Sequence, residues 1–220
     1  MMISRYPAEL TYDAANFVYR FAQCLRTVNG STCGLGIGDG SSWSGNQKPY
    51  IWGELDTSTS TWNEANPQPK AAHASRWAGL FSPIGNSGLD WFFDQQSSSF
   101  ISTKYAEAKI VGNYFKGVDY AGKRFSYLST DDVKLTSQSV STTNTSLRVL
   151  AMRAQNNSEV YAWVQNKNNA RWDQAVNTSA LSGSFTVPGI TNGTYRVETW
   201  DTYTGQVSQG SDITVTNGNL

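Results

Sequence analysis

The chain has 220 residues, enough for one large domain or two small ones. Its 17 basic and 17 acidic residues balance, so the composition offers no basic surface for a nucleic acid. Aromatic residues reach 13% while charged residues stay at 15%, a mixture typical of extracellular bacterial proteins that handle sugars and equally of ordinary secreted β-rich proteins.

The first half of the chain alternates helical patterns with buried-strand patterns. Apolar residues at helical spacing predict a helix over residues 11–28, followed by a glycine-rich loop. A short apolar run predicts a strand over residues 50–55. Further on, the pattern predicts a helix over residues 70–81, a strand over 89–93 and a helix over 103–115.

Both predicted strands run into acidic residues. Glu54 stands near the end of the first strand, and Asp94 follows the second. A strand, a crossover helix and a second strand make a βα unit, and in βα barrels the chemistry takes place at the carboxyl ends of the strands. A complete barrel takes about 250 residues, so the roughly 120 residues here, with two βα units, are too few to close one.

After about residue 120 the pattern changes to short alternating strands. They are separated by turn-forming residues at the spacing of a β-sandwich, and Asn192-Gly193 is a strong turn signal. The predicted strands cover residues 147–154, 160–165, 183–187, 195–201 and 213–216. We therefore expect a fold that is α/β plus all-β. Residues 1–120 would form a partial (β/α)8-type barrel, and residues 121–220 an antiparallel β-sandwich.

Reactive residues point to no metal and no cofactor. Cys24 and Cys33 can close a small disulfide loop or remain a pair of buried thiols, and His73 stands at no zinc-like spacing from them. No apolar run is long enough to cross a membrane. Residues 1–10 lack the apolar centre of a signal peptide, although the composition favours a secreted, extracellular protein.

Several short sequence motifs follow one another along the chain in a distinctive order. They are Lys48-Pro49-Tyr50-Ile51-Trp52-Gly53-Glu54, then His73 with Trp77-Ala78-Gly79-Leu80, then Trp91-Phe92-Phe93-Asp94. Two more, at residues 160–166 and 193–202, lie in the predicted sandwich. Together these phrases resemble the carboxyl-terminal part of cellulase-like glycoside hydrolases of the retaining (β/α)8-barrel clan, with the β-sandwich domain that follows their barrel.

The resemblance implies hydrolysis of a β-linked polysaccharide. Glu54 would be the nucleophile, and a second carboxylate about 5 Å away would protonate the leaving oxygen. Trp91 would form the floor under the sugar, and His73 and Phe93 would contact the substrate. The alternative for Glu54 is a carboxylate that caps a loop at the end of a strand.

The acid/base residue is where the chain departs from the family. The family places it in an Asn-Glu pair at the end of the fourth barrel strand, far upstream of the nucleophile. Trp62-Asn63-Glu64 looks like that pair but lies ten residues after Glu54 in a polar loop. A chance match explains Glu64 better than a catalytic role does, and we expect the isolated chain to be inactive unless another segment supplies the acid.

The incomplete barrel leaves three arrangements open. The chain is a fragment that lacks an N-terminal barrel segment, or neighbouring subunits complete its strands in a homo-oligomer, or the α/β part packs against its own sandwich. The alternative function is a non-catalytic carbohydrate-binding or self-assembling extracellular protein. Trp62, Trp163 or Trp172 would then stack on sugars, although a place in the core suits Trp163 better.

Overall fold

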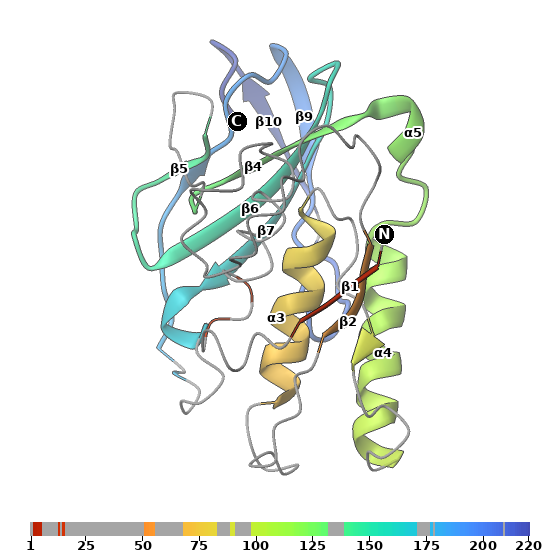
Figure 1. The fold of residues 1–220 in the computed structure, drawn as a ribbon. Coiled ribbons are helices and arrows are strands. Elements are labelled where there is room, and N and C mark those ends of the chain that lie inside the picture. The colour runs from red at the N-terminus through yellow and green to blue at the C-terminus, as the bar shows by residue number, and fades with distance from the viewer. Residues whose placement is uncertain are drawn as a thin grey trace, which may run out of the picture.

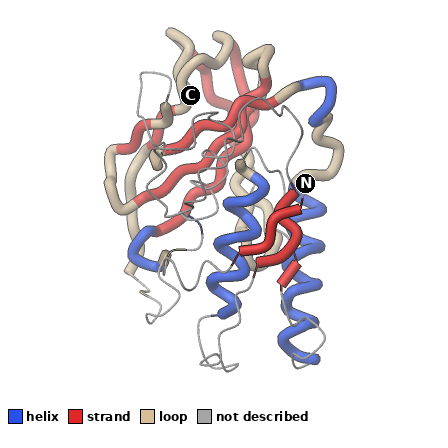
Figure 2. The backbone as a smooth tube through the Cα atoms, in the orientation of Figure 1, coloured by secondary structure: helices blue, strands red, loops and turns tan. Residues whose placement is uncertain are grey.

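The computed structural model describes residues 2–5, 13, 15, 51–55, 68–82, 89–90, 98–131, 139–170, 177, 179–208 and 210–220. These residues form a mixed fold of helices and small sheets (Figure 1). Figure 2 shows the two long helices at one end of the molecule and the antiparallel strands gathered at the other.

Three strands of the first half form a parallel sheet. They are β1 (Met2–Arg5), β2 (Ile51–Leu55) and β3 (Leu89–Asp90), and they stand in the order β1-β2-β3. The structure thereby confirms a parallel strand at the predicted position of β2. The strand predicted over 89–93 begins as β3, and its remaining residues lie outside the described part. Strand β1 was not predicted from the sequence.

Two helices connect and follow these strands. Helix α3 (Gln68–Leu80) lies between β2 and β3 in the chain, and α4 (Ser98–Tyr114) follows β3. Both were predicted, but α3 begins two residues and α4 five residues before the predicted start. Ala74, Trp77, Ala78 and Phe81 are buried at the spacing of one helical face, which is why this segment folds as a helix against a core. The helix predicted over residues 11–28 lies outside the described residues except for Asp13 and Ala15, and Ala15 is helical.

The second half of the chain forms antiparallel sheets. Strands β4 (Phe125–Ser129), β6 (Leu147–Ala154) and β7 (Val160–Asn166) pair in the order β4-β6-β7. Two smaller pairs are β5 (Ser141–Thr142) with β8 (Phe185–Thr186) and β9 (Gly193–Val197) with β10 (Ser211–Val215). A short helix, α5 (Tyr120–Lys123), precedes β4, and a 3₁₀ turn, η3 (Lys167–Asn169), follows β7. All five predicted strands are present, and β4 and β5 are additional.

Strand β6 is central because both of its faces are buried. Leu150 and Met152 belong to a cluster with Trp77, Phe81 and Trp163, which joins α3 to the sheet. The alternate residues of β6 belong to a second cluster on the other face, which comprises Leu128, Val140, Val149, Ala151, Val187, Ile190 and Val215. Alternation along a strand explains this division.

The first cluster crosses the boundary predicted at residue 120. Trp77 and Phe81 belong to the predicted α/β part, whereas Leu150, Met152 and Trp163 belong to the predicted sandwich. The helices therefore pack directly on the antiparallel sheet. Among the described residues there are three parallel strands and three small antiparallel sheets, which form no closed barrel. The partial barrel and the sandwich stay predictions.

Candidate functional site

The predicted nucleophile lies near the carboxyl end of a parallel strand. Glu54 is the last residue but one of β2, and its backbone is aligned with Ser4 of β1 and Leu89 of β3. The strand ends Arg5, Leu55 and Asp90 are aligned with one another at the same edge of the sheet. The sheet thus brings three chain segments together at the edge where the sequence predicts the chemistry.

A bulge in β2 immediately precedes Glu54. Ile3 pairs with Trp52 while Ser4 pairs with Glu54, so Gly53 is an extra residue on β2. A bulge bends the strand and changes the direction in which the following residue is presented, and bulges are over-represented next to active sites. Glycine within a strand commonly marks such a position.

Most of the other predicted site residues lie outside the described part of the chain. These are Trp62, Glu64, Trp91 and Phe93, together with the alternative sugar-stacking residue Trp172. Trp163 is described and is only 3% exposed, so it belongs to the core and presents no surface to a sugar.

His73 lies in a buried polar cluster between α3, α4 and the loop at residues 201–205. Its Nδ1 forms an ion pair with Glu107, whose other oxygen accepts a 2.6 Å hydrogen bond from Arg76 Nη1. Its Nε2 lies 3.2 Å from the hydroxyl oxygen of Thr202. Both ring nitrogens have protein partners and the residue is 5% exposed, so the geometry favours a role in joining these segments.

Asp201 shapes the loop that contacts His73. Its Oδ1 accepts hydrogen bonds from the backbone N–H groups of Tyr203 at 2.8 Å and Thr204 at 2.9 Å. These bonds, the one from Thr204 first, lower the pKa of the Asp201 carboxyl below its ordinary value.

Gly205 lets the loop approach α4. It has a φ of +71°, which a residue with a side chain rarely adopts. A Cβ atom at Gly205 would lie 3.1 Å from Cγ1 of Ile110. The loop is therefore held closely against both long helices.

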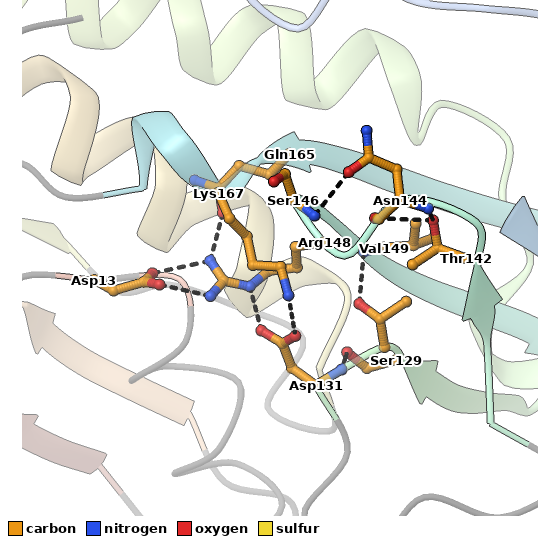
Figure 3. A network of polar contacts seen from close by, with 11 residues as sticks. Asp13, Ser129, Asp131, Thr142, Asn144, Ser146, Arg148, Val149, Gln165 and Lys167 are labelled. Atoms are coloured by element: carbon orange, nitrogen blue, oxygen red, sulfur yellow. Dashed lines mark hydrogen bonds and ion pairs between the residues drawn. The ribbon is translucent and has the colours of Figure 1, made fainter. Parts of the chain in front are cut away.

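Arg148 is the centre of a second buried network, shown in Figure 3. Its side chain is 2% exposed and makes a bidentate pair with Asp13 at 2.9 and 2.6 Å. Its Nε donates to Asp131, and its Nη1 donates to Gln165 at 2.5 Å. Burial alone would lower the pKa of Arg148, but the hydrogen bonds and charges of the two carboxylates outweigh burial and raise it. The network joins Asp13 to the antiparallel sheet.

Neither buried network was predicted from the sequence. The available signal for Arg148 was a charged residue between Leu147 and Val149 in a mostly apolar predicted strand. Its partners stood 135 and 17 residues away and had no local signature.

The described residues contain no group of three or more His, Cys, Asp or Glu side chains placed to hold a metal ion. In the same part of the chain, no helix is both long and apolar enough to cross a membrane.

Comparison of the chain with protein-family models, with curated proteins and with solved structures found no match.

Proposed function

We propose that this chain is part of a retaining glycoside hydrolase that acts on β-linked polysaccharide outside the cell, with Glu54 as its nucleophile. The observation that carries the proposal is the position of Glu54 at the carboxyl end of parallel strand β2, directly after the bulge at Gly53. A loop-capping carboxylate needs no such bulge.

The order of the strands also supports this function. The three strands are parallel neighbours in chain order, with α3 between β2 and β3 and α4 after β3, as successive βα units of a (β/α)8 barrel require. The proposal completes the barrel with a preceding segment or a neighbouring subunit, and takes the antiparallel sheets as the accessory sandwich.

The proposed reaction proceeds in two displacements. The Glu54 carboxylate attacks the anomeric carbon, the glycosidic C–O bond breaks, and an acid donates a proton to the leaving oxygen. Water then attacks the same carbon, gives its proton to the conjugate base of that acid, and releases Glu54. The acid belongs to Glu64 or to the segment that completes the barrel.

A probe with an activated leaving group tests Glu54 without that acid. We expect 2,4-dinitrophenyl 2-deoxy-2-fluoro-β-cellobioside to form an ester with Glu54 and release dinitrophenolate, because this leaving group needs no protonation. Release is followed by absorbance, and the modified peptide by mass spectrometry. Glu54→Gln should remain unmodified, whereas Glu64→Gln should be modified like the parent chain.

Two results would remove the assignment. One is a folded parent chain that stays unmodified at saturating probe. The other is modification that persists in Glu54→Gln.

The second candidate function is a non-catalytic protein that binds carbohydrate or assembles on the same scaffold. One observation favours it: Tyr203 is 68% exposed, on a loop fixed by the contacts described above. Polysaccharide binding by a folded chain that the probe does not modify would select this function.

A further inference from the structure

Tyr203 presents a flat ring to solvent in a fixed orientation. Its ring stacks on His73 with centroids 3.9 Å apart and planes 4° from parallel. His73 covers one face of the ring, and Tyr203 as a whole residue is still 68% exposed, so the exposed part of its ring excludes that face. An apolar ring this open, on a loop this constrained, is suited to receive a flat ligand.

The support behind the ring is buried. His73 is itself 5% exposed and is held by Glu107 on one nitrogen and by Thr202 on the other. The backbone N–H of Tyr203 donates to Asp201. The ring therefore loses little further conformational freedom when a ligand binds, which favours affinity.

Polar groups that suit sugar hydroxyls belong to the same turn as Tyr203. Asp201 and Thr204, two residues before and one residue after Tyr203, are both exposed. Backbone hydrogen bonds favour the charged form of Asp201, and a carboxylate accepts hydrogen bonds strongly. A pyranose offers C–H groups on its face and hydroxyls on its edge, which suits an exposed ring whose turn also carries a carboxylate and a hydroxyl.

We propose that Tyr203, with Asp201 and Thr204 beside it, forms a surface binding site for a β-linked polysaccharide chain, separate from Glu54. The ligand class rests on the proposed function, whereas the site itself rests on the stacked and exposed ring. The site would hold the polymer on the loop that packs against α3 and α4 while the parallel sheet acts on it.

Native gel electrophoresis through soluble polysaccharides tests the site. The probes are hydroxyethylcellulose, barley β-glucan and xylan, with α-linked dextran for comparison. We expect at least one β-linked polymer to retard the parent chain and dextran to leave its mobility unchanged. Tyr203→Ala should weaken retardation by about tenfold in dissociation constant, since a stacked ring is lost.

Matched variants separate the ring from general effects. Tyr105 on α4 is 62% exposed and provides an exposed tyrosine elsewhere, so Tyr105→Ala should leave retardation unchanged. Tyr203→Trp should retain binding, and Tyr203→Leu, which keeps apolar bulk without a flat ring, should lose it. Thermal unfolding of each variant checks that the loop variants remain folded.

The experiments distinguish failure of the proposed surface site from failure of the proposed role of Glu54. Glu54→Gln should lose probe modification and keep retardation. The surface site is overturned if no β-linked polymer retards the parent chain, if folded Tyr203→Ala or Tyr203→Leu binds like the parent, or if Tyr105→Ala loses binding equally. Failure of probe modification with retardation intact overturns the role of Glu54 alone.

Discussion

At the scale of single residues, Arg148 shows how burial changes the contribution of an ion pair to stability. Its guanidinium is almost fully enclosed, and two carboxylates and an amide take its donors. By contrast, Arg196 and Asp212 stand 3.4 Å apart with both side chains about 60% exposed. Exposed ion pairs of this kind contribute little to the free energy of unfolding. A buried charge that loses its partner, by contrast, strongly destabilises the folded protein.

We predict that Arg148→Met lowers the free energy of unfolding by about 3–5 kcal/mol, because Asp13 and Asp131 would keep their charges without a buried partner. The matched change Arg196→Met should alter it by about 1 kcal/mol or less. Urea unfolding followed by circular dichroism measures both. A loss for Arg148→Met no larger than for Arg196→Met would contradict the structural role of the network.

At the scale of elements, the sequence predicted those helices and strands that have a recognisable apolar pattern of their own. Strand β6 was found with its predicted bounds because its mostly apolar residues are bounded by turn-forming residues. Helix α3 was found because its apolar residues repeat at helical spacing. Strand β1 carries no such pattern: Met2–Arg5 becomes a strand by pairing with residues about fifty positions later.

Part of the candidate site could likewise be predicted from the sequence, and part could not. The strand that carries Glu54 was predictable, because an apolar run ending in a carboxylate is visible in the sequence. The bulge at Gly53 was not, since it is defined by the register against β1. The place of Tyr203 over His73 was not predictable either, because 130 positions separate them in the sequence.

The packing of α4 on the antiparallel strands predicts a dependence on alkaline pH. Tyr114 of α4 packs edge-on against Tyr161 of β7 and against Trp200. Burial, followed by the charge of Tyr161, raises the pKa of Tyr114 above its ordinary value of 10.0. At high pH the unfolded chain then binds fewer protons than the folded chain, so stability is retained below pH 10 and lost above it.

We expect the free energy of unfolding to fall above about pH 10, by no more than about 1.4 kcal/mol per pH unit for this one tyrosine. Tyr114→Phe should make the decline shallower. Guanidinium unfolding between pH 8 and 11 measures the slopes, and equal slopes for the parent chain and Tyr114→Phe would contradict the argument.

At the scale of the whole molecule, the two predicted domains share one hydrophobic cluster. Leu150, Met152 and Trp163 of the antiparallel sheet share this cluster with Trp77 of α3 and with Phe81 directly after it. Burying three such side chains contributes roughly 5–9 kcal/mol. That is comparable with the total stability of a domain, about 5–15 kcal/mol, so neither part is expected to be stable without the other.

We predict that residues 121–220 expressed alone bind the dye ANS and unfold without a cooperative transition. Co-expression with residues 1–120 should restore a complex of both pieces and a cooperative melt. Size-exclusion chromatography and calorimetry measure these outcomes. A monomeric 121–220 fragment with a sharp melt and no ANS binding would show that the shared cluster is dispensable.

The shared cluster also has a consequence during synthesis on the ribosome. Helix α3 emerges first, but the strand that covers Trp77 and Phe81 begins about 70 residues later, which corresponds to roughly 4–14 s of translation. During that interval an aromatic face of the nascent chain has no sheet to pack on. The molecule's yield in a cell should therefore depend on chaperones that shield such faces until β6 and β7 leave the exit tunnel.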